Sequence, residues 1–456
     1  MKKLTTILAL LASFAFAAVV GAQRPSTYST GIQVQNLSSS DTATISMSFY
    51  ALDNGTASVT ASDTIPAGES KTYFPLDSGT VTLPAGFDGA AVISSDQPVA
   101  AIVNVLGDGF AAGSSYGSFS EGSATVSLPL IAKNQVGIYD TFVNVQNAGS
   151  SDTTVTISYA NTTCTDTATI PAGAATRFDQ SADTCLPDGY VGAATVTTGN
   201  ASDSIVATVI ETSNNNTGLF AYNGFTSGST DIAAPLVMWN NSGFQSGFAV
   251  QNAGTASTDV TIEYTPVSGQ GTACTETATI AAGASVAFGL YAHAEIGNPV
   301  GTDTCANALF VGSARVSANS ANQPLVGIVN QTNFTNFASA YNAFDPSQAT
   351  NSLSMPLLMD RNGGFYTGFN LQNAGTASAN VTCTFSTSAG GQTISQFTAT
   401  LAAGAPVNQL QLDAASASAY VGSATCTADQ PIIAVVNQLG SSSTADLLFT
   451  YEAFNQ

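Results

Sequence analysis

The polarity of the chain alternates with a period of two over many short segments. Val, Ile, Thr and Tyr dominate these segments, for example residues 153–159 and 259–264, and clusters of Gly, Pro, Asn and Ser separate them. A strand with one face on a core and the other in solvent produces this alternation, whereas no helical period extends beyond about two turns. The pattern predicts an all-β fold of antiparallel β-sandwiches, with about seven strands in each.

The same series of markers occurs four times along the chain. A Val/Leu-Gln-Asn signature is followed by Ile/Leu-Pro/Ala-Ala-Gly, then by Gly-Ala/Ser-Ala, and last by Tyr-x-x-Phe. Successive signatures lie 111, 105 and 121 residues apart, which is long enough for each unit to bury its own core. We therefore expect four tandem Ig-like β-sandwich domains in an extended array. The signatures begin at Val34, Val145, Val250 and Leu371, and the expected domains are residues 23–122, 123–228, 229–348 and 349–456.

The first 22 residues have the features of a secretory signal peptide. Lys2 and Lys3 precede an uncharged apolar run that ends in the small residues Gly21 and Ala22. The alternative is a membrane anchor, but polar sequence rich in Ser and Thr follows the run, and no second apolar stretch occurs. We expect cleavage after Ala22, export to the extracellular space or the cell surface, and no membrane insertion afterwards.

The second, third and fourth units each open with a Pro-Leu segment that the first unit lacks. These segments begin at Pro129, Pro235 and Pro356, about sixteen residues before each Gln-Asn. In the first unit the equivalent position falls inside the predicted signal peptide. Two interpretations follow. Either export leaves the first unit one strand short, with an edge that can accept a neighbour's strand, or residues 23–30 cover that edge.

The cysteines fall in pairs within the last three units. Cys164 and Cys274 lie in matching Cys-Thr-Asp/Glu-Thr-Ala-Thr-Ile contexts, and Cys185 and Cys305 both follow Asp-Thr. We expect the disulfides Cys164–Cys185 and Cys274–Cys305, which are typical of an oxidising compartment. Metal binding is the alternative, but no unit has four soft ligands and no Cys-x-x-Cys occurs.

The fourth unit places its cysteines at other positions. Cys383 stands where the second and third units have Ile, and Cys426 stands where they have Val. Because two core positions became Cys in the same unit, we expect them to face each other in the sandwich. A disulfide between them requires Cα atoms about 5.5–6 Å apart.

Charge and rare residues exclude several functions. The chain has 8 Lys and Arg against 29 Asp and Glu, a formal net charge of −21, which is the wrong sign for a nucleic-acid partner. Hydrophobic residues make up 44% of the chain, enough for a sizeable core. A single His leaves little for imidazole catalysis or His-rich metal sites, so we expect no cofactor and no metal.

One catalytic motif can be matched, and only weakly. Gly113, Ser115 and Gly117 fit the G-x-S-x-G nucleophile elbow. An elbow requires a strand-to-helix turn and a His partner, and the single His293 lies in another unit. The acidic residues are thinly spread in turn-like contexts, so paired carboxylates for glycoside hydrolysis are not expected. The sequence predicts a protein without catalytic residues.

The least repetitive segment is an insertion in the third unit. Its segment between the Ala-Ala-Gly marker and the second Cys is 22 residues long, against 12 in the second unit, and contains Tyr291, His293 and Glu295. Loops on rigid sandwiches carry function, which makes this a candidate binding loop; an ordinary tolerated insertion is the alternative. The single Trp239 is a further candidate, as a platform for sugar stacking.

Together the markers resemble those of a family of exported proteins. Pro-Leu, Thr-Gly-Phe-x-Val/Leu-Gln-Asn-Ala-Gly, Ile-Pro-Ala-Gly and Ala-Tyr-Asn-x-Phe are similar to the motifs of bacterial exported and cell-surface proteins built from tandem Ig-like sandwiches. The resemblance covers essentially the whole mature chain and implies architecture and an exterior location. That family has no catalytic motif to carry over, and its functions are mostly unassigned.

We therefore expect a secreted, non-enzymatic structural or adhesive protein of the bacterial cell surface, sheath or extracellular matrix. Low charge, disulfides and abundant Thr, Ser and Gly suit a durable exterior material. The expected partners are further copies of the chain or other surface components. The alternative is an array of modules that bind extracellular polysaccharide or protein, which predicts shallow grooves with Asn, Asp and aromatic side chains at matching loops.

Overall fold

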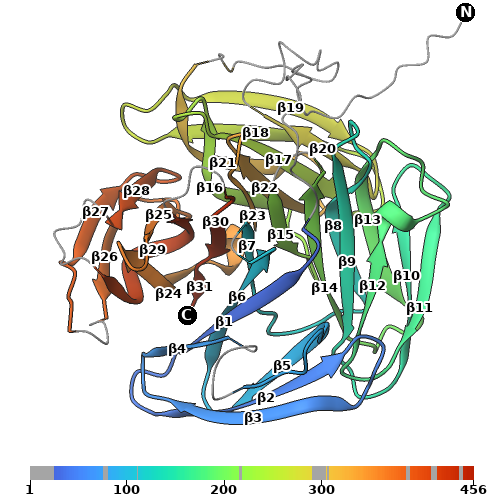
Figure 1. Ribbon diagram of the computed structural model, residues 1–456. Helices are drawn as coiled ribbons and strands as arrows, with labels where there is room; N and C mark the ends of the chain where they lie inside the picture. Colours follow the sequence, from blue (N-terminus) through green and yellow to red (C-terminus); the bar gives the residue numbers. More distant parts are fainter. Residues whose placement is uncertain are drawn as a thin grey trace, which may run out of the picture.

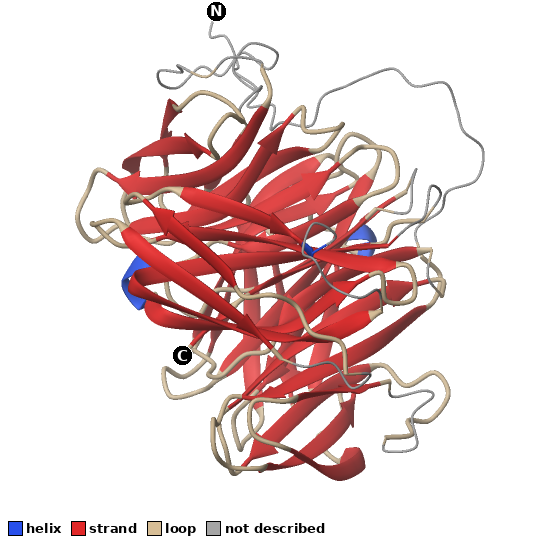
Figure 2. Ribbon diagram, turned by 90° about the vertical axis from the view of Figure 1, so that its left-hand side faces the viewer, coloured by secondary structure: helices blue, strands red, loops and turns tan. Residues whose placement is uncertain are grey.

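The computed structural model describes residues 25–74, 81–109, 111–214, 218–289, 305, 308–386, 391–411, 419–440 and 445–456. The predicted signal peptide lies outside these residues. Within them the chain is built almost entirely from antiparallel strands, with short 3-10 turns such as η1 (Gln180–Ala182) and η2 (Pro346–Gln348) (Figure 2). No helix in this part of the chain is long and apolar enough to cross a membrane. The predicted all-β antiparallel sandwich fold is confirmed.

The first unit pairs a sheet of four strands with a sheet of three. The strand orders in the described part are β4-β1-β6-β7 and β3-β2-β5. The strands are β1 (Tyr28–Asn36), β2 (Ala43–Ala51), β3 (Ala57–Ile65), β4 (Ser70–Tyr73), β5 (Gly89–Ser95), β6 (Val99–Gly107) and β7 (Ala112–Gly117).

The second and third units each pair two sheets of four strands, one strand more than expected from the sequence. The orders are β11-β10-β13-β8 and β12-β9-β14-β15, then β16-β21-β18-β19 and β20-β17-β22-β23. The second unit contains β8 (Thr125–Lys133), β9 (Tyr139–Asn147), β10 (Thr153–Tyr159), β11 (Thr165–Ile170), β12 (Ala175–Asp179), β13 (Tyr190–Thr198), β14 (Ile205–Ser213) and β15 (Leu219–Asn223). The third contains β16 (Asp231–Trp239), β17 (Gln245–Asn252), β18 (Thr258–Pro266), β19 (Cys274–Ile280), β20 (Ser285–Phe288), β21 (Phe310–Ala318), β22 (Leu325–Thr332) and β23 (Ala338–Asn342).

In the fourth unit one long strand belongs to both layers. The first half of β29 (Tyr420–Gly440) pairs with β24 and β26, and its second half pairs with β25 and β30. The other strands are β24 (Thr350–Asp360), β25 (Phe365–Asn373), β26 (Ala379–Phe385), β27 (Phe397–Leu401), β28 (Pro406–Leu410), β30 (Leu448–Glu452) and β31 (Phe454–Asn455).

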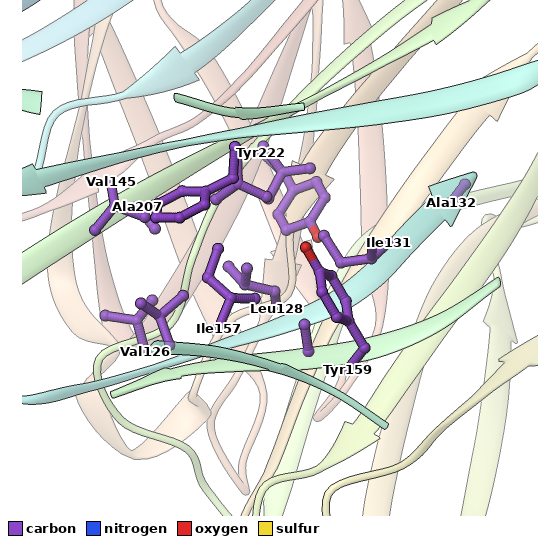
Figure 3. Packing of buried hydrophobic residues seen from close by; sticks show 14 of the residues in the cluster. Val126, Leu128, Ile131, Ala132, Val145, Ile157, Tyr159, Ala207 and Tyr222 are labelled. Carbon is purple, nitrogen blue, oxygen red and sulfur yellow. The ribbon is translucent and has the colours of Figure 1, made fainter. Parts of the chain in front are cut away.

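Alternating polarity builds the core of each sandwich. In β10 the side chains of Val155, Ile157 and Tyr159 are buried, while those between them are more exposed. Figure 3 shows the core of the second unit, with β8 and β10 contributing from one layer and β9, β14 and β15 from the other. This is the two-faced strand pattern that the sequence predicts.

The four units do not form the extended array that the sequence suggested. Their last strands, β7, β15, β23 and β30, lie together at the centre, where β7 contacts β15, β15 contacts β23, β23 contacts β30 and β30 contacts β7 (Figure 1). The ring therefore closes between the fourth unit and the first. The reason is physical: each unit buries apolar side chains against the next, so separating the units in a row would expose core.

Equivalent side chains carry this shared burial. Ile328, Val435 and Ile102 occupy the same position of their strands and are at most 1% exposed. Ile328 belongs to the core of the second unit, Val435 to that of the third and Ile102 to that of the fourth. The second unit has Thr208 at this position. Among the described residues, the core of the first unit contains no side chain from another unit.

All three expected disulfides are present: Cys164–Cys185, Cys274–Cys305 and Cys383–Cys426. Cys383 and Cys426 are directly opposite each other on β26 and β29, as are the Ile157–Val196 and Ile262–Val316 pairs of the preceding units. Their Cα atoms are 3.9 Å apart, not 5.5–6 Å, because the two positions are neighbours within one sheet and do not face each other across the sandwich. Three disulfides indicate an oxidising compartment.

Candidate functional site

The Gln-Asn signature is an internal latch. In the second unit the Asn147 amide donates to the backbone oxygens of Ser151 (2.8 Å) and Ile170 (3.0 Å) and accepts from the N–H of Gly149 (2.9 Å). Gln146 donates to the carbonyl of Gly173 (3.1 Å), the glycine of the Ile-Pro-Ala-Gly marker. The equivalent asparagines make the same bonds and are 0–1% exposed: Asn36, Asn147, Asn252 and Asn373.

This latch corrects one expectation about the turns. Asn-Ala-Gly between two strands is a sequence that predicts a turn with positive φ at Asn and Gly, but Asn147 and Gly149 do not have positive φ. The asparagine acts through its side chain, and the glycine leaves room for the amide: a Cβ at Gly149 would lie 3.1 Å from the Asn147 oxygen. Positive φ occurs instead at the glycine of the second marker, 77° at Gly173, where glycine carries no steric penalty.

The terminal Tyr-x-x-Phe tyrosine binds the Pro-Leu segment of its own unit. The Tyr222 hydroxyl donates to the Leu130 carbonyl (2.6 Å) and accepts from the Leu130 N–H (3.3 Å). Tyr451 binds both groups of Leu357 in the same way, at 2.7 and 3.2 Å. Tyr341 does so with Leu236. The first and last markers of the repeat therefore recognise each other, and we call this contact the tyrosine clasp.

Neighbouring units are joined by pairs of side chains on β6, β14, β22 and β29. One member of each pair comes from one unit, and its partner comes from the next unit, one position earlier in the equivalent strand. Three pairs are polar and hydrogen-bonded, and the fourth is apolar. They are Glu211 with Asn330 (3.0 Å), Gln331 with Asn437 (3.0 Å), Gln438 with Asn104 (3.5 Å), and Val105 with Ile210 in one apolar cluster. The order of the pairs runs from unit to unit and returns to the first, which specifies the closed arrangement.

A small cavity lies beside the first of these pairs, between the second and third units. It has a volume of about 70 Å³, and Tyr139, Phe220 and Phe334 contribute apolar walls. Glu211 and Asn330 supply its polar side, with Gln135. A space of this size between polar groups has room for water molecules.

Burial raises the pKa of the Glu211 carboxyl to about 7, and the hydrogen bond from Asn330 opposes that shift. Glu211 is 2% exposed. It stands where the next two units have Gln331 and Gln438, so it is a titratable variant of an otherwise neutral contact. Among the residues that line the cavity, Glu211 is the single carboxyl, whereas glycoside hydrolysis uses two.

Two further carboxyls lie at the central strands. Asp446 is 0% exposed and accepts hydrogen bonds from the N–H groups of Leu219 and Ala338, both at 3.0 Å, which ties together the starts of β15 and β23. Burial raises its pKa well above the usual range. Glu452 accepts from the N–H of Asn342, and burial raises its pKa to about 7. Both carboxyls cap backbone groups of neighbouring units, which is a structural role.

The G-x-S-x-G match lies on central strand β7, away from any helix. Ser115 is 1% exposed, and its hydroxyl donates to the carbonyl of Thr450 (2.7 Å). Gly113 permits the close approach of the fourth unit, because a Cβ there would lie 2.3 Å from the Phe449 ring. These residues close the ring, and the expectation that they form no elbow agrees with their place on a strand.

The predicted binding residues do not converge on a site. Trp239 ends β16 in the core of the third unit and is 8% exposed. The prediction that it forms an exposed platform for sugar stacking is therefore wrong. A large aromatic ring at a core position buries more apolar area than it would at a loop tip. Tyr291, His293 and Glu295 lie outside the described residues. Sequence reasoning missed Glu211 and Asp446; the exchange of Gln for Glu within aligned repeats was the available signal for Glu211.

Comparison of the chain with protein-family models and with curated proteins finds no match.

Proposed function

We propose that this chain is an exported, non-enzymatic structural or adhesive protein of the bacterial cell surface, sheath or extracellular matrix. The proposal rests on one observation: the repeated residues bind other parts of the same chain. The Gln-Asn latch, the tyrosine clasp and the unit-to-unit pairs all bind the chain to itself. The repeated residues are thus used mainly to hold the units of this chain together.

The disulfides and the surface chemistry support the same role. Each of the last three units carries one cross-link, and disulfides persist only in oxidising surroundings. A net charge of −21 favours solubility and repels anionic polymers. The alternative of a polysaccharide-binding array required exposed, repeated asparagines, and the four signature asparagines are buried.

Localisation on intact cells tests the proposal directly. We expect protease added outside the cells, and antibody against residues 229–348, to reach the protein without lysis, with a cytoplasmic protein as the negative control. Electron microscopy and light scattering of purified residues 23–456 then give its assembly state. Protection from external protease until the cells are lysed would refute the proposed location.

A further inference from the structure

In the described part of the first unit, no strand corresponds to the one that opens every other unit. In those units the strands β8, β16 and β24 pair with β13, β21 and β29 and complete the sheet. The equivalent strand of the first unit, β5, pairs with β2 on one side, and no described strand pairs with its other side. An unpaired sheet edge is a template for an added strand.

The tyrosine that clasps this strand is present in the first unit. Tyr116 pairs with Val103 in the same register in which Tyr222 pairs with Val209. Tyr222 binds both backbone groups of Leu130, whereas no hydrogen bond of the Tyr116 hydroxyl is found among the described residues. Tyr116 is partly exposed, and Tyr222 is 1% exposed.

The backbone of the terminal phenylalanine also binds the opening strand in other units. Phe225 exchanges two backbone hydrogen bonds with Ser127 of β8, at 2.8 and 2.9 Å, and Phe344 does the same with Ala233 of β16. Phe119 is the equivalent residue of the first unit. Within the described chain, neither its N–H nor its carbonyl has a backbone partner. The place of the missing strand is thus bounded by the β5 edge, the Tyr116 hydroxyl and the Phe119 backbone.

Apolar side chains face the same place. Ile93 of β5 is partly exposed, whereas the equivalent Val196 and Val316 are 0% exposed. Val103 of β6 is likewise partly exposed, against 0% for Val209. In the second unit the covering side chains are Val126 and Leu128 of β8, which Figure 3 shows within the core. The first unit thus has these apolar core positions, and no described strand covers them.

The segment after the predicted cleavage site does not supply that cover. Residues 28–30 pair with β6 in the other sheet, for example Tyr28 with Gly107. Ser26 and Thr27 bind the Asp108 carboxylate at 2.9–3.2 Å. For the described part of residues 23–30, the interpretation that this segment covers the β5 edge is wrong.

We propose that the first unit accepts a β-strand from a different exported polypeptide, held between the β5 edge and Phe119 and clasped by Tyr116. The chemistry of the strand follows from β8, β16 and β24: it is extended, nearly neutral and apolar on one face, with a central Pro-Leu. This inference goes beyond the proposed surface role and adds a means of attachment to it.

The occupant is assigned to another polypeptide for two reasons. The three Pro-Leu strands of this chain are already paired inside their own units, so a second copy has no such strand free. Within this chain, the spacing of 111 residues between the first two units aligns β8 with residues 14–22, which end at the expected cleavage site. Export would remove these residues and leave the place between the β5 edge, Tyr116 and Phe119 open; we call this place the slot.

Peptide binding tests the proposal on purified residues 23–456. The probe is a labelled synthetic peptide with the sequence of residues 124–134, and the control peptide carries Asp in place of Val126 and Leu128. We expect the first to bind with a micromolar dissociation constant and the second not to bind. Hydrogen exchange of residues 89–95 should slow on binding, because their free N–H groups become paired.

Matched variants decide whether the slot is the site. Y116F should weaken peptide binding about tenfold by removing the clasp hydroxyl, and Y366F, which removes a hydroxyl from β25, should leave it unchanged. Absence of peptide binding would overturn the proposal. So would binding that Y116F does not weaken and that leaves the hydrogen exchange of residues 89–95 unchanged. Either result would leave the surface role standing, since localisation tests that role separately.

Discussion

The first and second units share one fold and differ in how it is completed. Both align the last strand in the same register, Val103 with Tyr116 and Val209 with Tyr222, and both contain the asparagine bonds of the latch. The second adds a fourth strand to one sheet and a disulfide. The comparison teaches that the latch and the central strands define the unit, while the opening strand is a separable part that seals it.

Loss of the disulfide in the fourth unit should have the largest effect. C383I with C426V restores the side chains that the second unit has at this cross-strand pair, so packing is retained and the cross-link alone is lost. For a bridge that spans 43 residues, we expect the free energy of unfolding to fall by about 4 kcal/mol. Urea unfolding with hydrogen exchange measures the loss. The first unit, which has no Cys, should keep its protection, and a loss below about 1 kcal/mol would contradict the estimate.

Removal of the buried carboxyl between the second and third units comes next. The pKa of Glu211 rises from 4.5 to about 7 on folding, so the unfolded state releases its proton first as the pH increases. The free energy of unfolding therefore falls between pH 4.5 and 7, by about 3 kcal/mol, and stays low above that range. E211Q should recover this amount at pH 8 and nothing at pH 4.

The reverse exchange is the control. Q331E places a carboxyl against Asn437 and should produce the same pH dependence at the next interface. Thermal unfolding at several pH values measures both variants. If E211Q and the parent protein show the same pH profile, the Glu211 carboxyl is ionised in the folded state, and the raised pKa is wrong.

Truncation of one core side chain should cost the second unit more stability than the first, because the side chain is more deeply buried in the second. V196A removes atoms from a fully buried position and should cost about 2 kcal/mol. I93A removes more atoms from the equivalent position of the first unit, yet should cost less, because part of that side chain is already in water. Equal or reversed costs, measured by urea unfolding, would show that the core of the first unit is covered in solution.

The tyrosine hydroxyls give the smallest effect and the sharpest contrast. Y222F leaves the Leu130 backbone groups without their clasp and should cost about 1 kcal/mol. Y116F should change stability by less than about 0.5 kcal/mol while the slot is empty. Addition of the peptide of residues 124–134 should raise the melting temperature of the parent protein more than that of Y116F. A similar cost for both variants without peptide would mean that Tyr116 has a partner of its own.

Features that repeat could be predicted from the sequence. The matching contexts of Cys164 and Cys274 identified their bridges, and the exchange of two core positions identified Cys383 with Cys426. The spacing of the Pro-Leu segments agrees with the sheet of three strands in the described part of the first unit. Such inferences succeed because aligned units supply internal comparisons that a single domain lacks.

Contacts between the units could not be predicted in the same way. Ring closure depends on pairs such as Gln438 with Asn104, which are 334 residues apart and have no pattern that distinguishes them from surface amides. Trp239 was placed at the surface because it is unique, although uniqueness says nothing about burial. The distance between Cys383 and Cys426 was misjudged because equivalence of positions does not say whether two strands are neighbours or lie in opposite layers.

Ring closure also sets the order in which the protein can mature. Ser115 binds Thr450, 335 residues later, so the first unit leaves the ribosome long before its last neighbour is synthesised. During that interval both its central face and its open sheet edge are uncovered, and exposed edges and apolar faces promote aggregation of nascent chains. Fast synthesis or a bound chaperone would protect the chain most at this stage, and slowing synthesis of the fourth unit should prolong an aggregation-prone, protease-sensitive state.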